Sequence, residues 1–177
     1  MKLYVARHGQ TDWNLENRMQ GQTDVPLNET GINQAKKLKR KLESYDFDIC
    51  YCSPMKRAVQ TADIAVDGRA PILYDDNLKE RSYGSYEGVD CATWNVDEND
   101  RRLNTNEGGM EPIKTVLARS KKVLERIKKE NPDDARVLVV AHGALLQALH
   151  FTIVGYDDDT DFDSFELENA ALAEYDI

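Results

Sequence analysis

The sequence predicts an α/β protein with a mostly parallel β-sheet. Short apolar runs that suit buried strands alternate along the chain with longer segments in which apolar residues recur at helical spacing. Two of these runs, Lys2–Arg7 and Arg136–Ala141, are each followed by a histidine and then a glycine, which is typical of parallel strands that pass into loops. The 177 residues suit one domain, large enough for a sheet covered on both faces.

Five short runs predict the strands. They occupy residues 2–7, 47–52, 71–74, 136–141 and 170–177. Because helical segments separate most of these runs, we expect crossover connections and therefore a sheet that is mainly parallel.

Four segments predict helices. The first is expected near Thr30, a possible N-cap, and the second at Ser53–Pro54, with serine as the N-cap and proline at the first helical position. A long helix is predicted for roughly Glu111–Glu130, and Asn131–Pro132 is expected to end it. A shorter helix is predicted from Ala144 to about Ile153.

Two stretches do not suit core elements. Residues 9–29 are too polar, and residues 75–110 are rich in Asp, Asn, Gly and Arg, apart from a short amphipathic piece at 92–96. We therefore expect a single domain over residues 1–177, in which a variable segment at about 81–110 forms a lid or determines specificity.

Composition limits the location and the partners. The content of hydrophobic (41%) and charged (31%) residues is typical of soluble globular proteins. The sequence lacks an apolar run long enough to span a bilayer and lacks the features of a signal peptide, so we expect a cytoplasmic protein. The net charge of -9 disfavours nucleic acid and anionic membranes as partners. An anionic substrate therefore needs a locally cationic pocket.

The cysteines and the late acidic segment do not predict a metal site. Cys50 and Cys52 lie two residues apart in a predicted strand and point to the same face, without the further cysteines or histidines of a zinc site. Together with Cys91 they are expected to be reduced and mostly buried thiols. Tyr156–Asp163 lacks the central glycine and the closing glutamate of an EF-hand, so we interpret it as a solvated loop rather than a calcium site.

His8 and His142 are expected at the same rim of the sheet, because ligands of open α/β sheets bind beyond the carboxyl ends of the strands. A single histidine at a strand end is often structural, but two in matched positions, one preceded by Arg7, indicate a functional site. Asn14 adds an amide donor, and Arg57, which alone would be taken as a surface residue, follows the second strand. Together with helix amino termini, these donors suit a tetrahedral phosphoryl group.

His8 is the candidate nucleophile, since the sequence has no Walker motif, metal-ligand cluster or serine between glycines. A neutral imidazole that attacks phosphorus forms a phosphohistidine. The reaction also needs an acid for the leaving oxygen and a base for water. Glu80 is the first candidate for both roles and Glu87 the second. His150, within an apolar helix, is assigned to the core or to the helix surface.

Five segments resemble the motifs of the histidine phosphatase superfamily, which includes the cofactor-dependent phosphoglycerate mutases. They follow the family order over nearly the whole chain and are Arg7–Asn14 (RHGQTDWN), Arg18–Leu27, Ser53–Ala62, Leu78–Gly88 and Ala141–Gly143. The resemblance implies a three-layer α/β/α sandwich of the phosphoglycerate mutase-like type, with no metal or other cofactor.

The resemblance also implies roles for individual residues. It places the phosphoryl group on His8 and implies that Glu80 is the proton donor. The implied phosphate pocket consists of Arg7, Arg57 and His142. Further substrate-binding positions implied in this way are Asn14, Gln20, Thr23 and Gly143.

The superfamily contains both phosphatases and mutases, and the chain is short between the acid-bearing motif and the last histidine motif, where mutases are longer. Tyr86 also stands where a tryptophan is common in the family. We therefore predict a phosphomonoesterase that acts on a small phosphorylated metabolite. The alternatives are a cofactor-dependent phosphoglycerate mutase and an inactive binding module.

Arg101 and Arg102 either reach a second anionic group of the substrate or form a solvated pair in a loop. The sequence leaves the identity of the phosphate ester open, and it is compatible with a monomer or a homodimer.

Overall fold

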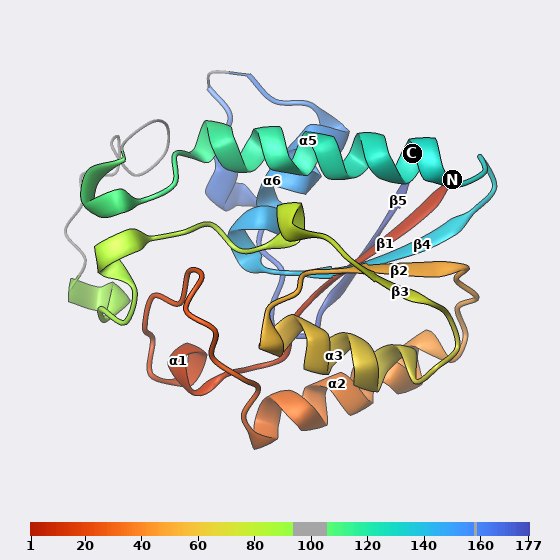
Figure 1. The fold of residues 1–177 in the computed structure, drawn as a ribbon, viewed down its shortest axis with the longest axis horizontal. Coiled ribbons are helices and arrows are strands. Elements are labelled where there is room, and N and C mark those ends of the chain that lie inside the picture. Colours follow the sequence, from red (N-terminus) through yellow and green to blue (C-terminus); the bar gives the residue numbers. More distant parts are fainter. Residues whose placement is uncertain (94–105, 158) are drawn as a thin grey trace.

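The computed structural model describes residues 1–93, 106–157 and 159–177. Within these ranges five strands form one sheet in the order β3-β2-β4-β1-β5 (Figure 1). The strands are β1 (Lys2–Arg7), β2 (Ile49–Cys52), β3 (Ile72–Tyr74), β4 (Arg136–Ala141) and β5 (Leu172–Asp176). The first four run parallel to their neighbours, and β5 pairs antiparallel with β1 at the edge. The predicted mostly parallel sheet is confirmed.

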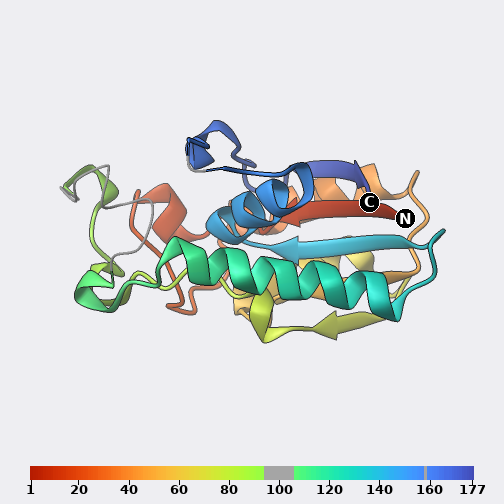
Figure 2. The same cartoon turned by 90° about the horizontal axis from the view of Figure 1, so that it is seen from above.

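Helices cover both faces of the sheet (Figures 1 and 2). The helices α5 (Ile113–Glu130) and α6 (Gly143–Val154) pack on one face, and α2 (Glu29–Leu42) and α3 (Lys56–Val66) pack on the other. This arrangement is the three-layer α/β/α sandwich that the family resemblance implies.

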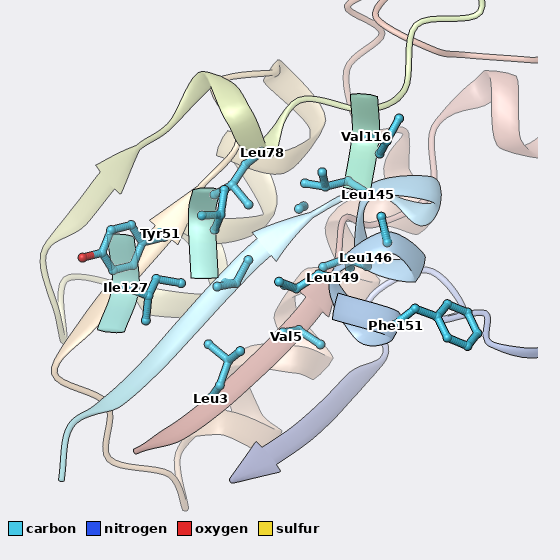
Figure 3. Close-up of a cluster of buried hydrophobic side chains, with 14 of the residues drawn as sticks. Leu3, Val5, Tyr51, Leu78, Val116, Ile127, Leu145, Leu146, Leu149 and Phe151 are labelled. Atoms are coloured by element: carbon cyan, nitrogen blue, oxygen red, sulfur yellow. The ribbon is translucent and has the colours of Figure 1, made fainter. Parts of the chain in front are cut away.

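Each interface between the sheet and its helices has its own core. In the core on the side of α5 and α6, Leu3 and Val5 of β1 lie close to Leu146 and Leu149 of α6 (Figure 3). The opposite core contains the alternate strand residues, together with the apolar faces of α2 and α3. Because both faces of β1 and β4 are buried, these strands read as continuous apolar runs in the sequence.

Two predicted helix starts are wrong by about two residues. The N-cap of α2 is Asn28, whose side-chain oxygen accepts from the amide of Gly31, and Thr30 lies inside the helix. The helix α3 begins at Lys56 and has Met55 at its N-cap position, because the Ser53 hydroxyl instead contacts His142 at 2.7 Å. Another polar residue thus takes the N-cap position of α2, whereas α3 has no side-chain cap.

The polar stretch at 9–29, which does not suit a core element, contains a short helix, α1 (Asp12–Leu15). Thr11 caps it, and Asn14 reciprocates by accepting from the Thr11 amide in a capping box. Short turns of 3-10 helix follow β3, at Asp76–Leu78, Gly84–Tyr86 and Cys91–Thr93.

The remaining predictions from single residues have mixed outcomes. Cys50 and Cys52 are buried in the same core, whereas Cys91 is half-buried. His150 is also half-buried, and its ring stacks on Phe165. The amphipathic piece expected at 92–96 is described only in part, and the predicted roles of Arg101 and Arg102 concern positions outside the described residues. No helix among the described residues has the length and apolarity needed to cross a membrane.

Candidate active site

His8 and His142 meet at the carboxyl ends of β1 and β4, as predicted. The two strands pair in parallel register up to Arg7 and Ala141, and the His8 amide continues the ladder by donating to the Ala141 carbonyl. The imidazole rings lie 5.1 Å apart between centroids, and both histidines are buried. Adjacent strand ends therefore bring together two residues that are 134 positions apart in the sequence (142 minus 8).

Arg57 connects the two histidines. It is the second residue of α3 and is fully buried. Its Nε lies 3.3 Å from Nε2 of His8 and 3.2 Å from Nδ1 of His142. The two Nη atoms donate to carbonyl oxygens of the loop between α1 and α2, at 3.0 Å to Thr23 and 2.7 Å to Gly21. A residue that looks like a surface arginine in the sequence is thus the centre of the site.

These contacts define the tautomer of each ring. Nδ1 of His8 lies 2.7 Å from the Gly9 carbonyl oxygen, which can only accept, so this nitrogen carries the proton. Nε2 of His8 then keeps its lone pair and accepts from Arg57. In His142, Nδ1 accepts from Arg57, so Nε2 carries the proton and donates to the Ser53 hydroxyl.

Burial and charge keep both rings neutral. Loss of solvent lowers the pKa of His8 and of His142 well below the usual 6.5, and the positive charge of Arg57 lowers both pKa values further. Burial also lowers the pKa of Arg57, but the negative charges of Glu80, Asp24 and Glu87 oppose this shift. At neutral pH the site therefore has an uncharged imidazole whose unprotonated Nε2 accepts from Arg57.

Arg7 reaches the site from the end of β1. Its Nη1 donates to the Glu166 carboxylate at 3.1 Å and to the Leu167 carbonyl at 2.7 Å. Its Nε is buried and has no hydrogen-bond partner within the described part of the chain. A buried donor without a partner costs free energy, so Nε is a natural donor for an oxygen of a bound anion.

The Glu80 carboxylate is nearly buried and lies at the amino terminus of α6. It accepts from the amides of Arg81 (2.8 Å), Ala144 (3.3 Å) and Leu145 (3.2 Å). The first amide of α3 is similarly bound, because Lys56 donates to Asp24. The helix amino termini were expected to face a phosphoryl group, but these first-turn amides bind carboxylates.

These groups surround a cavity of about 360 Å³. Seven of the predicted site residues line it: Arg7, His8, Asn14, Gln20, Arg57, Glu80 and Gly143. His142 is fully buried behind Arg57, and Thr23 contacts Arg57 through its carbonyl oxygen instead of lining the cavity. Within the described residues, no cluster of three or more His, Cys, Asp or Glu side chains is placed to hold a metal ion.

Further residues that line the cavity are not predicted from the sequence. They are Trp13, Asn17, Arg18, Met19, Gly21, Tyr83, Cys91, Ala144, Gln147, Asp163 and Glu166. Trp13 and Arg18 belong to segments that resemble family motifs, so these segments gave a signal for them. Asp163 and Glu166 lie in the late acidic region, and their spacing relative to the histidines gives no indication of a shared cavity.

The model of the histidine phosphatase superfamily (branch 1) matches residues 3–177. The chain belongs to this superfamily. A curated relative, the "uncharacterized phosphatase PhoE" of Bacillus subtilis, is 37% identical over 96% of this chain and 84% of its own length. A 2,3-bisphosphoglycerate-dependent phosphoglycerate mutase of Methylobacterium is 34% identical over 89% of this chain and 83% of its own.

Solved structures of two phosphatases superpose on nearly the whole chain. A mycobacterial glucosyl-3-phosphoglycerate phosphatase has a TM-score of 0.86 and 28% identity, over 98% of this chain and 91% of its own. A phosphoserine phosphatase of Entamoeba histolytica, solved with 3-phosphoglyceric acid, has a TM-score of 0.83 and 28% identity, over 98% and 89%. The protein is thus an enzyme of the histidine phosphatase family, and it is similar both to proteins named as phosphatases and to a phosphoglycerate mutase.

Proposed function

We propose that this histidine phosphatase hydrolyses the phosphomonoester of a small metabolite through a phosphohistidine on His8. The observation that carries the proposal is the state of the His8 ring. Gly9 binds the protonated Nδ1, and burial beside Arg57 keeps the ring neutral, so that Nε2 retains the electron pair needed for attack on phosphorus. A nucleophile in this state needs no further base.

In the first step, Nε2 of His8 forms a bond to phosphorus while the bond from phosphorus to the ester oxygen breaks. Glu80, in its protonated form, gives its proton to the departing alkoxide. The buried Nε of Arg7 and the guanidinium of Arg57 bind the non-bridging oxygens, over which the charge of the phosphoryl group is spread in the transition state.

In the second step, the Glu80 carboxylate accepts a proton from water, and the water oxygen attacks phosphorus. The bond from phosphorus to Nε2 then breaks, which releases inorganic phosphate and restores neutral His8. The position of Glu80 between the cavity and the start of α6 suits it for both proton transfers.

The charged side chains that line the cavity, among the described residues, favour hydrolysis over mutase chemistry. A mutase must bind a bisphosphate, which brings two strongly anionic groups into the cavity. The lining includes the carboxylates Asp163 and Glu166 as well as the cation Arg18, and Arg18 is 2.9 Å from Glu16. Similarity to proteins named as phosphatases supports the same conclusion, whereas the similar Methylobacterium mutase keeps mutase activity as the second candidate.

The test is release of phosphate from a chromogenic aryl phosphate and from a panel of phosphorylated metabolites, with His8→Ala as the control. We expect wild-type turnover, loss of turnover in the variant, and an acid-labile, alkali-stable phosphoenzyme after rapid quenching. Phosphoglycerate is then supplied with and without bisphosphoglycerate. Isomerisation that depends on the bisphosphate and exceeds phosphate release would favour the mutase.

A further inference from the structure

Glu87 does not line the cavity, although the sequence makes it the second candidate for the acid. It follows the turn Gly84–Tyr86, and its side chain reaches the loop after α1. Oε1 accepts from the amides of Gln22 (3.0 Å) and Tyr83 (3.1 Å). Oε2 accepts from the amide (2.9 Å) and the hydroxyl (2.6 Å) of Thr23. Four hydrogen bonds thus use both oxygens, and the carboxylate joins two loops.

The loop that Glu87 binds is the loop that holds Arg57. The peptide group between Gly21 and Gln22 donates its N–H to Glu87 and accepts, through the Gly21 carbonyl, from Nη2 of Arg57 at 2.7 Å. One planar peptide therefore connects the carboxylate to the guanidinium. Hydrogen bonds in such a chain polarise and strengthen one another. Thr23 provides a second connection, in which its amide donates to Glu87 and its carbonyl oxygen accepts from Arg57.

The backbone at Gly21 is shaped for this contact. Gly21 has a φ of +51°, and a Cβ at this position would lie 2.2 Å from Oε1 of Glu87. A side chain at residue 21 would thus collide with the carboxylate as well as adopt an unfavourable conformation. The close approach of carboxylate and backbone depends on this glycine.

Charge adds to the geometry. Among the described residues no carboxylate forms an ion pair with Arg57, which instead binds two carbonyls and two imidazoles. The negative charge of Glu87 is one of those that stabilise the charged guanidinium. Burial opposes ionisation of Glu87, but the hydrogen bonds from Thr23, Gln22 and Tyr83 outweigh it and hold its pKa below the ordinary value.

We propose that Glu87 is a positioning residue, which fixes the Arg57 guanidinium through the peptide groups at Gly21–Thr23 and so orients it toward His8 and the phosphoryl oxygens. The proposal rests on the proposed function, because it assigns Arg57 to the phosphoryl group. It differs from an acid role for Glu87, since the carboxylate acts through Arg57 and exchanges no proton with substrate.

The main variant is Glu87→Gln, which replaces one accepting oxygen by an NH2 group that faces backbone donors. We expect kcat/KM to fall roughly 10- to 100-fold, as for other small displacements of a binding group. The loss should be equal for an aryl and an alkyl phosphate. The dissociation constant for inorganic phosphate, measured by calorimetry, should rise in parallel. Thr23→Val, which removes only the hydroxyl donor, should show a smaller loss of the same kind.

Two comparisons separate positioning from general destabilisation. In an Arg57→Ala background, Glu87→Gln should cost less than about 3-fold more, because residues that act through one another are not additive. The matched control is Asp75→Asn, which alters another buried loop carboxylate that accepts from Asn77 and Arg126. It should leave kcat/KM within about 3-fold of wild type, even where it lowers the melting temperature as much as Glu87→Gln does.

The proposal fails if Glu87→Gln slows the alkyl ester much more than the aryl ester, since that result identifies a proton donor. It also fails if phosphate affinity is unchanged, or if the losses from Glu87→Gln and Arg57→Ala multiply. Phosphate binding needs no turnover. A wild-type protein that binds phosphate but lacks phosphatase activity would therefore overturn the proposed function and still test the role of Glu87.

Discussion

Nε of Arg57 lies 3.3 Å from Nε2 of His8, so a buried cation donates to the nitrogen that we propose as the nucleophile. The contact fixes the lone pair on Nε2 and disfavours protonation there, because a protonated ring would turn an N–H toward the guanidinium. In the proposed reaction a phosphoryl group comes between the two, and both then bind it from opposite sides. Arg57 thus keeps Nε2 of His8 unprotonated before the reaction and binds the negatively charged phosphoryl oxygens during it.

This relationship predicts the pH dependence of kcat/KM. Burial and Arg57 hold the pKa of His8 well below 6.5, so the neutral, reactive form persists as the pH falls through 6.5. We expect the acid limb of kcat/KM that reports His8 to lie well below that pH. Aryl phosphate hydrolysis from pH 4.5 to 8, corrected for ionisation of the substrate, measures it. An acid limb at or above pH 6.5 would contradict the proposed environment of His8.

The same shifts predict how stability depends on pH. The pKa values of His8 and His142 are lowered on folding, so the unfolded chain binds more protons and stability falls as the pH drops below about 6.5. The loss is about 1.4 kcal/mol per pH unit for each histidine, until the pH reaches the pKa of the folded state. Urea unfolding at a series of pH values measures this slope.

His142→Asn is the informative variant for this slope, because asparagine takes up no proton in this range. We expect a shallower decline below pH 6.5 than in wild type. His150 is the control, since its ring is only half-buried and its pKa is lowered less strongly. If His150→Asn flattens the curve as much as His142→Asn does, the two buried histidines are not the cause.

Features that depend on neighbouring residues can be predicted from the sequence, whereas contacts between distant residues cannot. Strand ends are local features, so the apolar runs before His8 and His142 located both residues at the sheet rim. The position of Arg57 after the second strand and the family resemblance both assign it to the site, although Arg57 taken alone suits a surface arginine. Its hydrogen bonds to the carbonyl oxygens of Gly21 and Thr23, which lie far away in the sequence, are visible only in the folded chain.

Predictions failed where several polar residues compete for one role. Asn28 caps α2 in place of Thr30, and Ser53 binds His142 instead of capping α3. Glu87 is the second candidate acid in the sequence, but only the folded chain shows that its oxygens accept hydrogen bonds from Thr23 and neighbouring amides. Local composition cannot rank such partners, since the decision is made by tertiary contacts.

Glu80→Gln tests the proposed acid. Because the proton matters most when the leaving oxygen is strongly basic, we expect a much larger fall in kcat/KM for an alkyl phosphate than for an activated aryl phosphate. The control is Glu166→Gln. The Glu166 carboxylate lines the cavity and binds Arg7, and its side chain is 69% exposed. This variant should affect both esters equally. Equal losses for both esters in Glu80→Gln would remove Glu80 from the acid role.

The three cysteines should differ in reactivity. Burial raises the pKa of Cys50 to about 12 and that of Cys52 well above its ordinary value, so neither forms a thiolate at pH 8. Cys91 is half-buried, lines the cavity and has a less strongly raised pKa. We expect one thiol per chain to react with a disulfide reagent in the native protein and three in urea. Two fast-reacting thiols in the native state would contradict the packing of β2.

Arg119 is predicted to support the segment that carries Glu80. From α5, its Nη1 donates to the carbonyls of Asn77 (2.7 Å) and Lys79 (2.8 Å), and its Nε and Nη2 bind the Glu111 carboxylate at 2.8 Å. The side chains of Arg119 and Glu111 are only 15% and 13% exposed. Arg119→Ala therefore removes the guanidinium from two carbonyls and from a mostly buried carboxylate, which keeps only the Ser82 amide as a donor among the described residues. We expect the change to cost about 3 kcal/mol in urea unfolding.

The matched control for Arg119→Ala is Arg136→Ala, which removes an ion pair with Asp46 in which both side chains are at least half exposed. That change should cost less than about 1 kcal/mol, because water and salt screen exposed pairs. Where Arg119→Ala remains folded, displacement of Glu80 should slow the alkyl ester more than the aryl ester, as Glu80→Gln does but less severely. If the two arginine variants are equally stable, or if Arg119→Ala slows both esters alike, the guanidinium does not hold the Glu80 segment in place.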